Sequence, residues 1–238
     1  MPQDRGRTAA RGPRPTKGKP TLREQQRQRT RRLFIEAAAA SFRANGYAAT
    51  SVDDIAKAAG ATRATFYLHF SGKADVMHEL LATVGGETRD LHVQLTEAVA
   101  AGTREAVAAW LDAAFDFWER LGSLLRAQEE AAALHPEVGQ ARDAVFDSGV
   151  AAVVAGLDQS GRGCEATRRP RGVLAYAQLQ SMNRRWMRRG WDIDRATTLE
   201  VMTDVWMTIF AVPPAVKPAA ARRTARPSTG RAAPSGRR

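Results

Sequence analysis

The side chains best suited to specific chemistry lie close together, between positions 62 and 73. The set comprises Thr62, Arg63, Thr65, Tyr67, His69 and Lys73. Hydroxyl, guanidinium, imidazole and ammonium groups at this density suit hydrogen bonds to phosphates and to the edges of bases. By contrast, the chain has four histidines, one cysteine and no HExxH, GxSxG or P-loop pattern. We therefore expect binding of an anionic partner, and neither an enzyme nor a cofactor or metal site.

Residues 50–61 carry the local signals of a helix followed by a turn. Ser51 and Asp54 have the spacing of a capping box, in which each side chain accepts a hydrogen bond from the other residue's backbone N–H. Gly60 tolerates the left-handed conformation that ends a helix and turns the chain. Thr62 can then cap a second helix.

The second helix, of about two turns, is expected to be anchored by two aromatic residues. Phe66 and Phe70 lie four positions apart, so both can point into the core while Arg63 and Tyr67 stay on other faces. A short helix with polar and basic residues near its N-terminus suits insertion into the major groove of DNA. The alternative is an ordinary helical hairpin in a helical protein.

This stretch resembles the DNA-binding segment of the TetR family of transcriptional regulators. The family pattern runs roughly T-T-V-x-D-I-A-x-x-A-G-V-S-x-G-T-F-Y-x-Y-F-x-S-K-E-D-L. The positions in step with it are Thr50, Val52, Asp54, Ile55, Ala56, Ala59, Gly60, Thr65, Phe66, Tyr67, Phe70, Lys73 and Asp75. The departures are Ala64 for the usual Gly, His69 for the usual second Tyr, and Gly72 for the usual Ser.

The resemblance implies that the polar residues of this segment contact double-stranded DNA. Thr62, Arg63 and Thr65 become the expected contacts to bases. The expected phosphate contacts are Thr50, Ser51, Tyr67, His69 and Lys73. A solvated surface side chain is the alternative for Arg63 and for His69.

The formal charge of +11 over 238 residues is concentrated at the two ends. Residues 1–21 hold six basic residues and one acid, and residues 213–238 hold seven basic residues and no acid. We predict two disordered basic tails, because both segments are nearly free of large apolar residues. Between them, 22–75 carries nine basic and five acidic residues, whereas 76–212 carries fourteen and nineteen. This polarity favours a DNA-binding head on a neutral-to-acidic body.

The N-terminal tail can be interpreted in two ways. Its Arg-Gly-Pro-Arg-Pro run resembles arms that read the minor groove of DNA, and the alternative is a solvated tail that adds only non-specific affinity. The single cysteine, Cys164, excludes an internal disulfide and leaves a bystander thiol or a redox sensor as alternatives. No signal-peptide core or bilayer-length apolar run is present, so we expect a cytoplasmic protein without membrane association.

Helical periodicity dominates the rest of the chain, which predicts an all-α fold. Residues 22–75 are expected to form a three-helix head that contains the helix-turn-helix. Residues 76–212 are expected to form a helical bundle for ligand binding and dimerisation. The expected helices span about 24–44, from 73 onward, 104–121, 137–160, 172–189 and 194–211, with a polar loop at 160–171. Gly85 and Gly86 are expected points of bending in the long helix after position 73.

The C-terminal part resembles the ethionamide-repressor branch of the same family, whose members bind an effector in a long apolar tunnel. The resemblance rests on the segment RRPRGVLAYAQLQSMNRRWM and on a last helix that bears a tryptophan. The implied effector-binding residues are Trp110, Phe117, Leu121, Gln180, Asn183 and Trp206. Of these, Leu121 and Gln180 differ from the expected Phe and Asn. The alternative is that these aromatic residues only pack the core.

The resemblance also implies a homodimer, formed by the two C-terminal helices of each chain. The resulting hypothesis is a sequence-specific transcriptional repressor that binds a near-palindromic operator and is released by a small apolar effector. The alternative is a non-specific, nucleoid-type DNA-binding protein driven by its basic tails.

Overall fold

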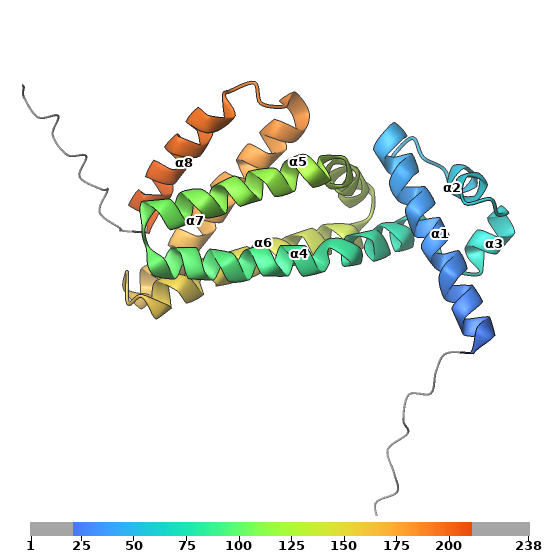
Figure 1. Ribbon diagram of the computed structural model, residues 1–238, viewed down its shortest axis with the longest axis horizontal. Helices are drawn as coiled ribbons and strands as arrows, with labels where there is room; N and C mark the ends of the chain where they lie inside the picture. The colour runs from blue at the N-terminus through green and yellow to red at the C-terminus, as the bar shows by residue number, and fades with distance from the viewer. Residues whose placement is uncertain (1–20, 211–238) are drawn as a thin grey trace, which may run out of the picture.

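The computed structural model describes residues 21–210, which form eight α-helices and no strand. The helices are α1 (Leu22–Asn45), α2 (Val52–Ala58), α3 (Arg63–Tyr67), α4 (Lys73–Ala101), α5 (Arg104–Leu134), α6 (Pro136–Gln159), α7 (Glu165–Arg189) and α8 (Arg195–Ile209). Helices α1 to α3 form a head at one end, and α4 to α8 form an elongated bundle (Figure 1). The predicted all-α fold is confirmed. The tails predicted at 1–21 and 213–238 lie outside the described residues, except for Thr21.

Helix α1 is fixed by a cap at its start and by aromatic packing along one face. Thr21 Oγ1 accepts a hydrogen bond from the backbone N–H of Glu24 at 3.3 Å, and Glu24 Oε2 accepts one from the N–H of Thr21 at 2.7 Å. Further along, Phe34 and Phe42 are buried in the core of the head. Phe34 meets the ring of Phe66 edge to face, with 5.3 Å between ring centroids. This contact holds α3 against α1.

The helix-turn-helix forms through the predicted local signals. Ser51 Oγ accepts from the N–H of Asp54 at 3.1 Å, and Asp54 Oδ2 accepts from the N–H of Ser51 at 2.8 Å. Gly60 has a φ of 66°, in the left-handed region that favours glycine. Thr62 Oγ1 caps α3 by accepting from the N–H of Thr65 at 3.1 Å. Helix α3 has five residues, so it is shorter than the two turns predicted.

The head rests on the corner between α5 and α6. Ala131 of α5 and Val138 of α6 are buried in the same hydrophobic cluster as the phenylalanines of the head. Beside them, Glu130 Oε2 accepts a hydrogen bond from the backbone N–H of Ala48 at 2.9 Å. The head therefore contacts the bundle at this corner as well as through α4.

The bundle has its own core, which lies between α4, α5, α6, α7 and α8. Leu111, Phe115 and Trp206 are fully buried there. Helices α4 and α6 approach closely at Gly156, where an added Cβ would lie 2.6 Å from the carbonyl oxygen of Thr96. None of the helices between residues 21 and 210 combines the length and the apolar character needed to cross a membrane.

Two predicted boundaries are wrong. The helix expected at 104–121 continues to Leu134, because its last turns pack under the head. The loop expected at 160–171 is shorter, because α7 already begins at Glu165 and includes Pro170. A polar, glycine-rich composition is typical of a loop, yet the polar residues from Glu165 onward belong to the helix. Helix α4 continues through Gly85 and Gly86.

Candidate DNA-recognition face and effector cavity

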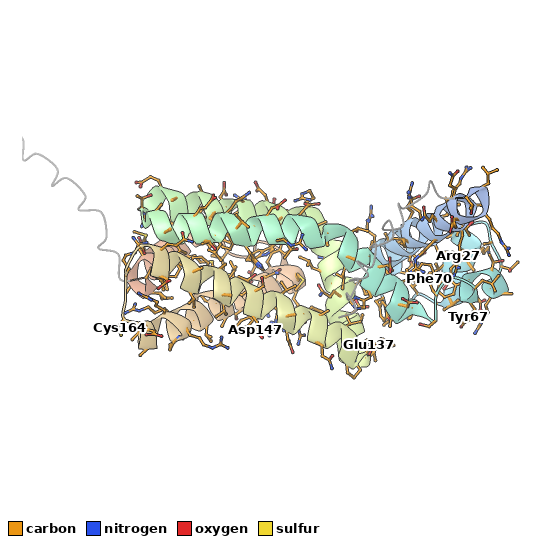
Figure 2. All side chains as sticks on the ribbon, turned by 90° about the horizontal axis from the view of Figure 1, so that it is seen from below. Arg27, Tyr67, Phe70, Glu137, Asp147 and Cys164 are labelled. Atoms are coloured by element: carbon orange, nitrogen blue, oxygen red, sulfur yellow. The ribbon has the colours of Figure 1, made fainter. Side chains whose placement is uncertain are left out.

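Helix α3 presents one side to the core and the other to solvent. Phe66 and Phe70 are buried, whereas Thr62 and Arg63 are exposed and Tyr67 is 47% exposed. Figure 2 shows Tyr67 at the end of the molecule opposite Cys164. The polar side of α3 is therefore open to a partner as large as a DNA duplex.

Arg63 forms an exposed ion pair in which an anionic partner can take the place of Asp53. Its guanidinium lies 2.9 Å from Asp53 Oδ2 and 3.5 Å from the hydroxyl oxygen of Tyr67. Both side chains of the Arg63–Asp53 pair are about 60% exposed, and exposed pairs of this kind contribute little to stability. The Asp53 carboxylate and, after it, Tyr67 raise the pKa of Arg63, whose guanidinium is in any case always charged. A phosphate or a base edge can therefore take the place of Asp53 at little loss.

The two threonines of α3 lie next to each other at the start of the helix. Their hydroxyl oxygens, Thr62 Oγ1 and Thr65 Oγ1, are 2.9 Å apart. Thr62 Oγ1 also caps the helix. The three residues expected to contact bases thus lie within one turn, at the N-terminal end of α3, where backbone N–H groups also point outward.

The structure corrects the prediction for Thr50. Its side chain is 1% exposed, and its hydroxyl donates to the carbonyl oxygen of Gly46 at 2.7 Å. A phosphate contact by this hydroxyl is excluded in this conformation, because the group is buried and already bonded. The sequence pattern could not distinguish a buried threonine that ties a loop from an exposed one.

Lys73 and His69 also make contacts within the head. Lys73 Nζ donates to the carbonyl oxygens of Tyr47 and Thr50, both at 2.8 Å, and burial lowers the pKa of Lys73. The ring of His69 packs on Phe34 at 5.8 Å between centroids, and burial, followed by nearby arginines, lowers the pKa of His69. Both groups hold the head together, and their predicted phosphate contacts stay predictions. Ser51 is exposed, and its hydroxyl is occupied by the cap of α2.

Two exposed residues near α3 were not predicted as contacts. Arg27 of α1 is exposed and lies close enough to His69 to lower the pKa of that imidazole. Figure 2 places Arg27 at the same end of the molecule as Tyr67. Leu68, directly after α3, is 73% exposed. The signal for Arg27 was present in the run of arginines that begins α1, but only the fold shows that it lies next to α3.

A cavity of about 390 Å³ lies in the bundle, lined by α4, α5, α6 and α7. Four of the six residues expected to bind an effector line it, namely Trp110, Phe117, Gln180 and Asn183. Trp118, Leu125 and Leu179 belong to the apolar part of the lining, and Arg89, His92 and Glu129 to its polar and charged part. A concave site that combines apolar walls with placed polar groups is the usual form of a small-molecule site.

The other two expected residues do not line the cavity. Trp206 is fully buried behind Trp110, with the two rings stacked at 5.4 Å between centroids. Its indole N–H donates to Gln178 Oε1 at 3.1 Å. Leu121 is half-buried on α5, and Leu125, one turn later, lines the cavity instead. Helical spacing identified the right helices, but the rotation of α5 and α8 about their axes decides which residues reach the cavity.

The polar groups that line the cavity differ in whether they already have a hydrogen-bond partner in the protein. The indole N–H of Trp110 donates to the carbonyl oxygen of Leu91 at 2.8 Å, so it is not available to a ligand. Asn183 Oδ1 is buried and has no hydrogen-bond partner within residues 21–210. Buried polar atoms are rarely left unpaired. Asn183 is therefore the predicted residue best placed to hydrogen bond a ligand.

Sequence reasoning missed a polar chain in the cavity lining. His92 of α4 is 8% exposed, with Nδ1 3.0 Å from Ser148 Oγ and Nε2 2.8 Å from the hydroxyl oxygen of Tyr176. Burial lowers the pKa of His92 and raises that of Tyr176. The three residues come from α4, α6 and α7 and are 28 or more positions apart, so no local pattern could reveal them.

An exposed recognition helix behind a capped turn, joined to a bundle with an apolar cavity, defines a helix-turn-helix transcriptional regulator. Residues 34–80 match the family described as bacterial regulatory proteins, tetR family. The regulator EthR of Mycobacterium tuberculosis is 32% identical over 168 residues, which cover 66% of this chain and 76% of EthR. The chain belongs to the TetR family.

Other relatives match a shorter stretch or share only the fold. The regulator TtgR of Pseudomonas putida is 42% identical over 67 residues, and the match spans 31% of its length and 28% of this chain. The crystal structure of NalD, described as the secondary repressor of a multidrug efflux pump in Pseudomonas aeruginosa, superposes with a TM-score of 0.58 at 21% identity, covering 79% of this chain and 97% of NalD. A complex of SmeT with triclosan gives 0.59 at 20% identity, covering 80% of this chain and all of SmeT.

Proposed function

We propose that the protein is a homodimeric transcriptional repressor that recognises a specific operator and leaves it when a small apolar effector binds. The observation that carries the proposal is the polar side of α3, where Thr62 and Arg63 are exposed and the partly buried Thr65 lies within the same turn. In this proposal these residues contact bases, while Tyr67 and Arg27 contact phosphates. The head at 22–75 reads DNA and the body at 76–212 binds the effector.

Dimerisation supplies the second head. Helices α7 and α8 expose large apolar side chains, with Leu174 62% and Val201 55% exposed. Pairing these two helices with the same helices of a second copy would cover both side chains. A two-fold dimer of this kind reads two half-sites about one helical turn of DNA apart, near 34–36 Å, so the operator is near-palindromic.

The effector part of the proposal rests on the cavity. Its lining includes α4, which begins at Lys73 in the head, and α5, whose end carries Glu130 against the head. SmeT has been obtained in complex with triclosan, and NalD is named as a repressor. An effector releases DNA only as far as it binds the released state better, typically by about 1–3 kcal/mol.

Selection of duplexes from random DNA with the purified full chain tests operator recognition. We expect enrichment of one near-palindromic sequence with two half-sites about 10 base pairs apart. A pool without enrichment would contradict the proposal. The alternative, a non-specific coating protein driven by the basic segments 1–21 and 213–238, predicts that removing both segments abolishes most binding. A repressor keeps its preference for the selected duplex after the same removal, with a shallower salt dependence.

A further inference from the structure

The chain of hydrogen bonds from Tyr176 through His92 to Ser148 has a direction. The Tyr176 hydroxyl is buried, and its hydrogen bond within the described residues is to His92 Nε2 at 2.8 Å. A buried hydroxyl proton without an acceptor is unfavourable, so Tyr176 donates and Nε2 accepts. A neutral imidazole then carries its proton on Nδ1 and donates it to Ser148 Oγ, 3.0 Å away.

This direction leaves one donor without a partner. Tyr176, His92 and Ser148 carry three protons on their polar atoms, and the two internal hydrogen bonds use two of them. The remaining proton is the hydroxyl proton of Ser148. Ser148 lines the cavity and is exposed, so its hydroxyl can turn toward a molecule bound there.

We propose that Ser148 donates a hydrogen bond to the effector, and that the effector is an apolar molecule with a carbonyl-type acceptor oxygen. This rests on the proposed effector cavity. The apolar part of the molecule lies against Trp110, Phe117 and Trp118, which line the same cavity. His92 and Tyr176 are positioning residues, because they act through the orientation of Ser148.

The acceptor oxygen can belong to a neutral carbonyl or to a carboxylate. Arg89 lines the cavity three residues before His92, on the same side of α4, and makes no ion pair within residues 21–210. The cavity lining therefore offers a carboxylate a guanidinium that has no ion pair among the described residues, in addition to the Ser148 hydroxyl. The two forms share one recognition chemistry and are separated by the choice of probe.

Three probes with the same aromatic body test the proposal on the full-length protein. They are 4-phenyl-2-butanone, 4-phenylbutanoate and butylbenzene, which lacks an acceptor oxygen. Binding is followed by tryptophan fluorescence, since Trp110 and Trp118 line the cavity, and confirmed by calorimetry. Each dissociation constant is compared between wild type and variants for one probe at a time, so differences in probe hydrophobicity cancel.

Ser148→Ala should weaken binding of the ketone roughly two- to tenfold and change binding of butylbenzene less than twofold, as expected for one net hydrogen bond. Ser148→Thr, which keeps the hydroxyl, should restore binding of the ketone. Tyr176→Phe removes the donor to Nε2, which fixes the tautomer of His92, so it should weaken binding of the ketone by less than Ser148→Ala does and change binding of butylbenzene less than twofold. Ser123→Ala, on α5 outside the lining, is the matched control. Melting temperatures verify that each variant is folded.

The possible outcomes test the hydrogen bond from Ser148 separately from the effector cavity. If Ser148→Ala leaves the ketone unaffected, or weakens ketone and butylbenzene equally, the proposed hydrogen bond is wrong and the cavity stands. If none of the probes binds, the effector cavity itself is contradicted, while operator recognition by α3 is untouched. If Ser148→Ala weakens binding of 4-phenylbutanoate and Arg89→Gln weakens it further, a carboxylate is the preferred form of the acceptor. A loss for the ketone alone identifies a neutral carbonyl.

Discussion

Arg63 and Arg27 lie at the same end of the molecule and differ in what surrounds them. Arg63 is at the start of α3, beside two threonines, and is paired with Asp53. Arg27 is on α1, is exposed and has no ion pair within the described residues. In the proposed function, the guanidinium of Arg63 contacts a base and that of Arg27 contacts a phosphate. The two arginines should therefore differ in how their removal changes binding.

Replacement of Arg27 by alanine should weaken binding to the selected operator and to a scrambled duplex by the same factor. The reason is that a phosphate contact carries no sequence information. The slope of log affinity against log salt should become shallower by about one. Titrations of both duplexes at several salt concentrations measure this. A loss restricted to the operator would contradict a phosphate role for Arg27.

Histidine burial predicts how stability depends on pH. Burial places the pKa of His92 below the value of 6.5 expected in an unfolded chain. The unfolded state therefore takes up more protons as the pH falls below 6.5, and the stability present above that pH is lost. His69 has a lowered pKa too and adds to the same trend. Urea unfolding between pH 7 and pH 5 should show a decrease in the free energy of unfolding.

The variant His92→Gln isolates the contribution of His92, because glutamine hydrogen bonds at both ends without titrating in this range. Its stability should fall less than that of wild type between pH 7 and pH 5. Equal decreases in the two proteins would show that His92 is not held neutral by burial.

The close contact between α4 and α6 depends on the small size of Gly156. Its backbone conformation is helical and would allow other residues. Gly156 lies in the helical part of α6, and an added Cβ would meet the carbonyl oxygen of Thr96 and the β-branched side chain of Val99, neither of which is the far end of a flexible side chain. We expect Gly156→Ala to lower the free energy of unfolding by about 1–3 kcal/mol through overpacking. Gly86→Ala is the matched control, because nothing lies within 4 Å of an added Cβ there. It should raise the free energy of unfolding by about 0.5–1 kcal/mol. Urea unfolding of both variants measures the difference, and equal signs would contradict the packing.

The sequence was a better guide to helix caps and turns than to the packing between helices. The caps at Ser51 and Thr62 and the turn at Gly60 depend on neighbouring residues, so they could be predicted. The end of α5 could not be predicted in this way, because the helix continues past position 121 to pack under the head, which is a contact between distant parts of the chain. The same reason explains Thr50, whose burial depends on the loop that follows α1. The chain of Ser148, His92 and Tyr176 required the three-dimensional fold.

The proposed DNA-binding head and the proposed effector cavity are connected at the corner between α5 and α6. Residues that line the cavity, such as Gln128, lie within one turn of Glu130, which accepts a hydrogen bond from the N–H of Ala48 in the head. A rearrangement of the cavity can therefore reach the loop between α1 and α2 through a short, rigid helix end. This contact gives the proposed effector response a physical route, in addition to α4.

Loss of this contact should loosen the loop that follows α1. In Glu130→Ala, the amides of residues 46–50 should exchange with deuterium roughly two- to tenfold faster, because the N–H of Ala48 loses a charged acceptor. Glu97→Ala, on an exposed position of α4, should leave these amides unchanged. Unchanged exchange in Glu130→Ala would show that the contact does not stabilise the loop.

Recognition of DNA sequence by α3 is measured by the ratio of affinities for the selected operator and for a scrambled duplex of equal length. Arg63→Ala should reduce this ratio on the order of tenfold or more, because a lost contact to a base removes preference along with affinity. Arg126→Ala, which removes the same charge from an exposed position on α5, should leave the ratio unchanged. A ratio that is the same in wild type and Arg63→Ala would contradict recognition of DNA sequence by α3.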